Sequence, residues 1–418
     1  MGIRNRERPV AGLTQGGIIR RFGAPRRLLF YSHDGLGLGH VRRNLAIAAA
    51  VVEADAGAAV LVATSADEVA EMKLPPAVDV LKLPGMRKAA GGGYAPRHLR
   101  VPSAEVREVR AALLKAAVES FRPSVLVADR HPLGIGGELR GALRTLRAAG
   151  GQAVLGLRDI LDDSSRVRED WSRHGTCESI AELYDRVLVY GDPNVYDSVA
   201  EYDMPPDVGA MARYCGYVTR PGEVRPRGRA QRKRPVVLAT AGGGEDGYTL
   251  LRTFVQAAAG MPWQSVVVSG RQARPRQIEA LRAAAGAAGI AFRPFLPDLA
   301  EHLPDVDALV CMGGYNTLVE AMAAGLPAVC VPRTVPRQEQ LIRARRFSEL
   351  GLLQMLEPSE LAPERLRAEV ALALALPRGQ VTTRALATLP LGGARVAAAE
   401  LLALGERAAG APAAAAIA

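Results

Sequence analysis

One stretch places the narrowest limits on how this chain can fold: residues 311–332, CMGGYNTLVEAMAAGLPAVCVP. A short apolar run, typical of a buried parallel strand, leads into the turn at Gly313 and Gly314, and an apolar helix follows. Asn316 and Thr317 are the candidate caps of that helix. A helix N-terminus behind a glycine turn, at the carboxyl end of a parallel strand, is suited to bind an anion or a nucleotide.

The same order of strand, glycine loop and helix occurs at two other places. In the N-terminal half a strand leads into GLGLGH, which ends at His40, and in the C-terminal half a strand leads into Gly242–Gly244. These repeated signals predict an α/β fold of two Rossmann-like, doubly wound domains that face each other across a cleft, with a ligand bridging both. The predicted divisions are a flexible basic arm over 1–25, an N-terminal domain over 26–218, a Pro-, Gly- and Arg-rich linker over 219–235, a C-terminal domain over 236–408 and a disordered tail over 409–418.

Composition excludes several classes of protein. The 418 residues carry a formal net charge of +10, but no basic stretch is interleaved with aromatic residues, so we do not expect nucleic acid as a partner. An anionic ligand, an anionic membrane face and a merely solvated arginine surface remain as explanations of the charge. The four cysteines form no CxxC pair, and neither a secretory apolar core nor a run of about 18 apolar residues occurs. We therefore expect a cytoplasmic protein with free thiols.

Two glycine-rich loops of the C-terminal half are candidates for holding a diphosphate. The loop of Gly242, Gly243 and Gly244 and the turn of Gly313 and Gly314 follow strands of the same predicted domain. Glycine lets backbone amides approach a phosphate closely, and the helix dipole favours an anion there. An ordinary glycine loop with no ligand is the alternative for either segment taken alone.

Carboxylate and amide side chains near these loops are candidates for binding a ribose or a sugar. Glu320 stands inside an apolar helix, so it is either exposed or hydrogen-bonded, and a ribose diol is a suitable partner. Gln338, Glu339 and Gln340 follow the next strand and carry groups that bind sugar hydroxyls. The alternative for these three residues is a polar loop that leads into a helix.

Polar side chains also gather at strand ends of the N-terminal half. His40, at the end of the glycine loop, is a candidate general base or pyrophosphate contact, with a helix-capping histidine as the alternative. Asp129, which follows a buried strand, is a second candidate catalytic residue. Further candidates for the acceptor side are Gly37, Gly39, Arg42, Arg130, His131 and Asp159, although neighbouring Asp and Arg residues are also common on surfaces. Because no His, Cys and Asp grouping has metal-ligand spacing, we expect neither a metal nor a cofactor.

Taken together, these residues resemble a glycosyltransferase of the GT-B fold. The similarity is strongest to the family of N-acetylglucosaminyltransferases that complete the lipid-linked peptidoglycan precursor, over residues 295–357, where FLPDL, the stretch 311–332 and RQEQ follow in the family's order. The loop that ends in His40 resembles the family's first glycine loop. The middle of the chain, with VLVADRHPLGIGGEL and LGLRDILDD, is more similar to an uncharacterised subgroup of predicted glycosyltransferases.

The resemblance implies a role for each matching residue. The C-terminal domain would bind the donor, with Asn316 and Thr317 among its binding residues, its glycine loops on the diphosphate, Phe295 and Leu296 near the nucleobase and Glu320 on the ribose. Glu339 and Gln340 would contact the donor sugar, although Glu339 stands where the relative has glutamine. The N-terminal domain would hold the acceptor, with His40 as its base or oxyanion contact.

The sequence thus predicts an inverting, metal-independent glycosyltransferase that takes a UDP-sugar as co-substrate, with UDP-N-acetylglucosamine as the favoured donor. It does not identify the acceptor, which is either lipid-linked or a small molecule. A nucleotide-sugar 2-epimerase and a catalytically silent nucleotide-sugar-binding regulator are the alternative functions. The basic arm and the loop from Arg87 to Arg100 are candidates for peripheral contact with anionic lipid at the inner face of the membrane.

Overall fold

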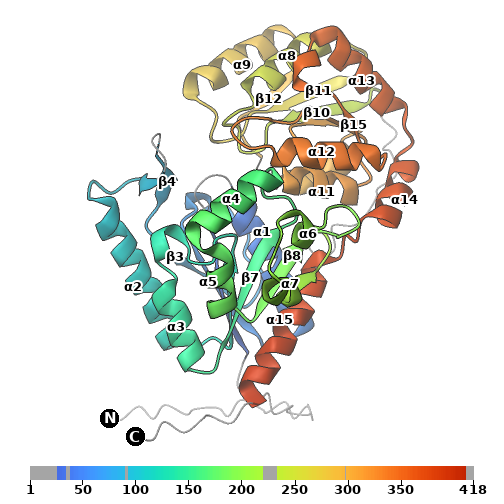
Figure 1. Cartoon of the computed structure of the whole chain (residues 1–418). Helices are drawn as coiled ribbons and strands as arrows, with labels where there is room; N and C mark the ends of the chain where they lie inside the picture. The colour runs from blue at the N-terminus through green and yellow to red at the C-terminus, as the bar shows by residue number, and fades with distance from the viewer. Residues whose placement is uncertain (1–25, 34–37, 90–92, 220–232, 297, 411–418) are drawn as a thin grey trace, which may run out of the picture.

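A computed structural model describes residues 26–33, 38–89, 93–219, 233–296 and 298–410. Within them the chain forms two separate parallel sheets, each flanked by helices (Figure 1). The predicted arm over 1–25 lies outside the described residues, as do most of the predicted linker over 219–235, most of the predicted tail over 409–418, and Gly37.

The N-terminal sheet has seven parallel strands in the order β3-β2-β1-β6-β7-β8-β9. Parallel strands are covered on both faces, and β6, with the sequence VLVAD, is buried at every position. The strands are β1 (Arg27–Tyr31), β2 (Ala59–Thr64), β3 (Val78–Lys82), β6 (Val125–Asp129), β7 (Gln152–Arg158), β8 (Arg186–Tyr190) and β9 (Ala212–Tyr214), and β4 (Met86–Lys88) and β5 (Tyr94–Pro96) form a separate antiparallel hairpin. The helices of this half are α1 (Gly39–Ala54), α2 (Ser103–Phe121), α3 (Arg140–Ala148), α4 (Ser164–His174), α5 (Thr176–Leu183), α6 (Ser198–Glu201) and α7 (Pro206–Met211).

The C-terminal sheet has six parallel strands in the order β12-β11-β10-β13-β14-β15. The strands are β10 (Val236–Thr240), β11 (Gln264–Val268), β12 (Ala291–Arg293), β13 (Ala308–Cys311), β14 (Ala328–Cys330) and β15 (Gln354–Met355). The helices are α8 (Tyr248–Ala258), α9 (Pro275–Ala287), α10 (Leu299–His302), α11 (Tyr315–Ala323), α12 (Glu339–Glu349), α13 (Pro363–Ala375), α14 (Arg378–Thr388) and α15 (Gly393–Gly410).

Both sheets reverse their strand order at a point that positions the site. In the N-terminal sheet the reversal falls between β1 and β6, and in the C-terminal sheet it falls between β10 and β13. Open α/β sheets bind ligands outside the carboxyl ends of the strands at such a switch point. The loops that follow these four strands carry His40, Asp129, Gly242–Gly244 and Gly313-Gly314, respectively.

The last helix, α15, leaves the C-terminal domain. It packs along α1 and also contacts β6 and β7, so it completes the cover of the N-terminal sheet (Figure 1). The predicted C-terminal domain over 236–408 therefore includes a helix that belongs, by packing, to the other half. Residues 378–408 are apolar and long enough to cross a membrane by composition, yet half of the most apolar window is buried inside the protein, as in a core helix.

Candidate active site at the domain interface

A buried cluster of three side chains lies at the N-terminal switch point. His40 stands in the first turn of α1, and its Nδ1 lies 2.8 Å from Oδ2 of Asp129 at the end of β6. Arg43, one turn further along α1, donates to both carboxylate oxygens of Asp129 at 2.8 Å. All three residues are buried, so the carboxylate is paired within the protein and not with water.

The protonation states of this cluster follow from its contacts. Arg43 and His40 outweigh the opposing effect of burial and hold the pKa of Asp129 at about 2, so this carboxylate is ionised near neutral pH. Burial, which Asp129 opposes, lowers the pKa of His40 below its usual value, with further lowering by Arg43 and Arg158. A neutral histidine beside an ionised carboxylate carries its proton on Nδ1, which leaves the lone pair on Nε2. The ring can therefore accept a proton at Nε2.

Two glycine loops of the C-terminal switch point leave open space where a side chain would stand. A Cβ atom added at Gly242 or Gly314 would meet no atom within 4 Å. Gly313 and Gly244 have φ angles of 84° and 97°, a left-handed backbone that glycine adopts without strain. Glycine loops beside a helix N-terminus, here that of α11, suit a diphosphate because their backbone amides can approach its oxygens.

The two switch points are in direct contact. Asn316 in the first turn of α11 donates from Nδ2 to the Gly39 carbonyl at 3.2 Å. The prediction that Asn316 caps its helix is therefore wrong, because Gly314 is the N-cap residue and the amide side chain turns to the other domain. Thr317 lies half-buried in the same turn and makes no cap hydrogen bond either.

A second buried ion pair crosses the interface. Arg343 of α12 lies 3.2 Å from Asp159, which follows β7, and neither side chain is exposed. The same guanidinium donates to the carbonyls of Gly313 and Ile160, each at 3.3 Å. Asp159 was predicted on the acceptor side, but the structure engages it in this pair with the donor-side domain.

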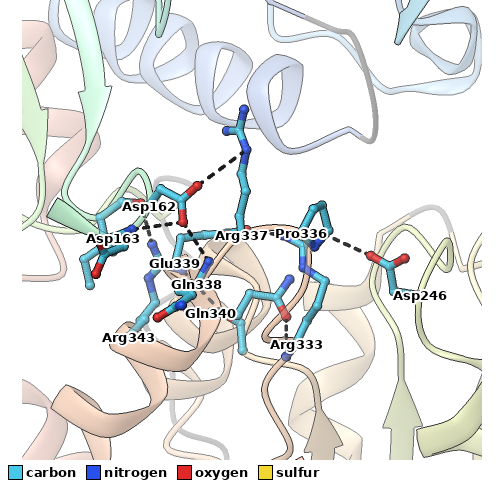
Figure 2. A network of polar contacts seen from close by, with 12 residues as sticks. Asp162, Asp163, Asp246, Arg333, Pro336, Arg337, Gln338, Glu339, Gln340 and Arg343 are labelled. Atoms are coloured by element: carbon cyan, nitrogen blue, oxygen red, sulfur yellow. Dashed lines mark hydrogen bonds and ion pairs between the residues drawn. The ribbon is translucent and has the colours of Figure 1, made fainter. Parts of the chain in front are cut away.

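The loop between β14 and α12 contributes a polar network to the cleft, which Figure 2 shows from close by. Arg333 is hydrogen-bonded to Oε1 of Glu339, and its other terminal nitrogen donates to Asp246 at 3.0 Å. Gln340 accepts from the Arg333 backbone at 3.2 Å. The Oε2 atom of Glu339 is buried and has no hydrogen-bond partner among the described residues, so this oxygen can accept a hydroxyl of a ligand.

The other predicted donor residues lie around these loops. Phe295 and Leu296 are half-buried, and the guanidinium of Arg271 lies 4.3 Å from the Phe295 ring centroid. Glu320 is half-buried on α11. Gln338 donates from its backbone to Asp162 of the N-terminal domain at 2.8 Å, so it also bridges the halves (Figure 2).

The predicted acceptor residues gather on the opposite wall. Arg130 and His131 follow Asp129 directly, and the rings of His131 and His33 lie 4.4 Å apart. His33 in turn lies 6.1 Å from the His40 ring. Arg42 is half-buried on α1. Its neighbour Arg43, and not Arg42, makes the contacts to Asp129 described above.

Sequence reasoning missed Arg43 and Arg343 as site residues. Arg43 stands among the buried positions of the apolar helix α1, and Arg343 lies beside the apolar Leu341, Ala344 and Phe347 of α12; this is the signal that was available. An arginine inside an otherwise buried stripe needs a buried partner, but the sequence does not say which carboxylate supplies it. Among the described residues no group of three or more His, Cys, Asp and Glu side chains is arranged to hold a metal ion.

Known proteins share this fold and part of this sequence. Residues 254–388 match the glycosyltransferase family 28 C-terminal domain. The chain is similar to the UDP-N-acetylglucosamine–N-acetylmuramyl-(pentapeptide) pyrophosphoryl-undecaprenol N-acetylglucosamine transferase of Polaromonas naphthalenivorans. The two are 33% identical over 160 residues, and this match covers 37% of this chain and 43% of that protein. The protein of the same name from Verminephrobacter eiseniae is 33% identical over 258 residues, 60% of this chain and 64% of that protein. The chain spans about two fifths of the length of the first relatives that it matches.

Solved structures agree over almost the whole chain. The calicheamicin glycosyltransferase CalG4 superposes with a TM-score of 0.59 at 21% identity, covering 93% of this chain and 100% of that one. MurG of Acinetobacter baumannii superposes with a TM-score of 0.55 at 15% identity, covering 92% and 100%. The fold and the facing switch points therefore define a GT-B protein with two Rossmann-like domains, which confirms the predicted fold class. Within that class the chain is similar to the peptidoglycan N-acetylglucosaminyltransferases, as its sequence predicted.

Proposed function

We propose that this protein transfers a sugar from a nucleoside-diphosphate sugar to an acceptor hydroxyl. The observation that carries the proposal is the contact between the two switch points. The His40–Asp129 pair lies against the glycine turn at the start of α11, joined by the hydrogen bond from Asn316 to Gly39. The family 28 match and the GT-B neighbours support a nucleotide sugar as the donor.

In this proposal His40 is the general base and Asp129 is a positioning residue. The acceptor hydroxyl gives its proton to Nε2 of His40, while Asp129 holds the Nδ1 proton and stabilises the imidazolium that forms. The hydroxyl oxygen forms the new bond to the anomeric carbon as the bond from that carbon to the diphosphate breaks. Attack from the face opposite the leaving group inverts the anomeric centre. Asp129 itself is a poor base, because its pKa of about 2 makes its carboxylate a weak proton acceptor.

The leaving diphosphate is stabilised, in this proposal, by the protein and without a metal ion. Backbone amides of the two glycine loops and the positive end of the α11 dipole are preorganised where the negative charge develops. The open positions at Gly242 and Gly314 leave room for the phosphate oxygens.

UDP-N-acetylglucosamine is the donor that we favour. Relatives that this chain matches in sequence carry this nucleotide sugar in their names. The unpartnered Oε2 atom of Glu339 supports a sugar hydroxyl at this place, because a buried carboxylate oxygen without a partner is costly. Glu320 is proposed to bind the ribose and Phe295 to lie beside the base.

We also infer a cytoplasmic protein that contacts the inner face of the membrane. Leu99 and Val101 are exposed by 52% and 40% directly after the β4–β5 hairpin, and exposed His98 and Arg100 flank Leu99. Exposed apolar side chains with a cation between them, here Arg100, suit an anionic lipid surface. Sedimentation with vesicles that contain anionic lipid at low salt tests this addition, and no binding would remove it.

A thermal-shift screen against UDP, TDP, GDP and their sugars tests the proposed function. We expect UDP and UDP-N-acetylglucosamine to raise the melting temperature, and Glu320→Ala and Glu339→Gln to abolish most of this rise. Glu349→Gln is the matched control, since Glu349 lies on the exposed side of α12. UDP release that requires an added acceptor then separates a transferase from an epimerase or a silent binder. If no nucleotide stabilises the protein, the proposal is wrong.

A further inference from the structure

A pocket of about 280 Å³ is lined by residues of both domains. Arg130 and His131 form one wall, Arg166 and Trp171 of α4 form another, and Arg337 of the C-terminal domain closes it. His131 connects the pocket to the catalytic centre, because its ring lies 4.4 Å from His33, which lies 6.1 Å from His40. A group bound in the pocket is thus one layer of side chains away from the base.

The acidic side chains of this pocket are already engaged. Glu169 accepts from Arg173 at 2.6 Å, and Asp170 lies 3.4 Å from His174. Asp162 accepts the Gln338 backbone N–H at 2.8 Å, as Figure 2 shows. Glu169 is thus neutralised by a cation, and the four arginines that line the pocket outnumber its three carboxylates.

The other three arginines of the pocket, Arg130, Arg166 and Arg337, have no carboxylate within hydrogen-bonding distance among the described residues. Arg166 donates to the Pro336 carbonyl at 2.9 Å, a partner that leaves its charge uncompensated. Arg337 forms only a long ion pair with Asp162, at 3.9 Å and beyond hydrogen-bonding distance, and its guanidinium projects past that carboxylate in Figure 2. Arg130 lines the pocket and forms no ion pair with any residue in the described ranges. The pocket thus presents an excess of guanidinium charge.

The backbone at Arg130 is held in an unusual conformation. Its φ angle is 73°, a left-handed value that a non-glycine residue rarely adopts. Hydrogen bonds from Arg130 N to the Gly156 carbonyl at 2.8 Å and from His131 N to the Asp129 carbonyl at 3.0 Å maintain it. Strain of this kind persists where the chain must direct a side chain to a site, and here that residue lines the pocket next to Asp129.

We propose that this pocket binds an anionic group of the acceptor, a phosphate or a carboxylate. Arginine is suited to both because its planar fork donates two parallel hydrogen bonds to such oxygens. Arg337 comes from the donor-side domain, so the subsite is complete only when the two domains are together. The inference rests on the proposed function, since it assigns the bound anion to the molecule that receives the sugar.

Trp171 supplies a local reporter for the test. The chain has two tryptophans, so Trp263→Phe leaves the Trp171 indole as the only one, in the pocket wall. We would titrate this variant with inorganic phosphate, glycerol phosphate and glucuronate at constant ionic strength and follow the emission. We expect a saturable change in emission. Tighter binding of glycerol phosphate indicates a phosphate subsite, and tighter binding of glucuronate indicates a carboxylate subsite.

Two further substitutions and one control decide the result. Arg130→Asn removes the charge while keeping a residue that tolerates a left-handed backbone, and Arg337→Gln removes the cation of the other domain. Each should weaken binding about tenfold or more, as for a lost charge-assisted hydrogen bond. Arg168→Gln on α4 is the matched control, because Arg168 pairs with Asp203 and does not line the pocket.

The subsite is refuted if the titration shows no saturable change. It is also refuted if Arg130→Asn and Arg337→Gln bind the anion as tightly as the parent Trp263→Phe protein. Failure of the proposed function is a different result, because the thermal shift with UDP reports the donor loops and Trp171 reports the pocket. If UDP does not bind while the Trp171 titration still depends on Arg130, the pocket binds anions but its assignment to an acceptor is wrong.

Discussion

Breaking the ion pair across the domain interface should destabilise the protein strongly. Arg343 and Asp159 are both fully buried and lie 3.2 Å apart. Asp159→Asn keeps the shape of the side chain but removes its charge, and it leaves the Arg343 guanidinium buried without a counter-ion. The carbonyls of Gly313 and Ile160, each at 3.3 Å, remain as its acceptors.

The size of the effect follows from this environment. Removing one partner of a buried pair costs about 3–5 kcal/mol, because the other charge stays desolvated. Because two carbonyl contacts to Arg343 remain, Asp159→Asn should lower the free energy of unfolding by about 3 kcal/mol, the lower end of that range. Arg343→Met should cost a similar amount, since it strands the carboxylate, whereas the double variant strands no charge. We therefore expect the double variant to lose less than either single variant, and well below the additive sum of about 6 kcal/mol.

Urea unfolding of the wild type, both single variants and the double variant measures this coupling. Small-angle X-ray scattering of the same proteins reports whether the two halves separate, and the single variants should have the larger radius of gyration. Arg346→Met on α12 is the control, because its pair with Glu349 is exposed and its change should stay within about 0.5 kcal/mol. Single variants that lose less than about 1 kcal/mol, or losses that add in the double variant, would refute the reasoning.

Three further outcomes are expected. Asp129→Asn should lower kcat about 10²- to 10⁴-fold in a UDP-release assay, because the Nδ1 proton of His40 loses its acceptor; a loss below tenfold would count against the positioning role. Burial lowers the pKa of His131 to about 4 in the folded protein, so below pH 6.5 the unfolded chain binds a proton at this residue more readily than the folded chain. The free energy of unfolding should therefore fall by up to about 2 kcal/mol from pH 7.5 to pH 5. Urea titrations of His131→Asn should show a smaller dependence on pH. Gly244→Ala places a Cβ atom 2.3 Å from the Ser269 carbonyl and should abolish stabilisation by UDP, whereas Gly286→Ala on α9, where a Cβ atom meets nothing within 4 Å, should retain it in the same thermal-shift assay.

Local sequence signals were sufficient for the elements and for the loops. Apolar runs that end in glycine predicted buried parallel strands, and the order of these units predicted two doubly wound halves. Gly242, Gly244 and Gly313 all adopt positive φ angles, which agrees with their prediction as turn residues. Such features depend on neighbours in the chain, so the sequence carries them directly.

The cap at α11 shows where local reasoning ended. Asn316 has the right chemistry for an N-cap, but Gly314 takes that position and Asn316 reaches the Gly39 carbonyl instead. The competing partner lies 277 residues away, in the other domain. A capping rule compares only neighbouring residues, and it cannot weigh a partner that docking brings close.

The sequence by itself determined two α/β halves, their glycine loops at strand ends and His40 beside the first of these loops. Only the tertiary structure decided that His40 pairs with Asp129, that Arg343 reaches Asp159 over 184 residues, and that α15 returns to the N-terminal sheet. The reason is physical: strand and turn preferences are set by adjacent residues, whereas the partner of a buried charge is set by which distant surfaces exclude water from each other.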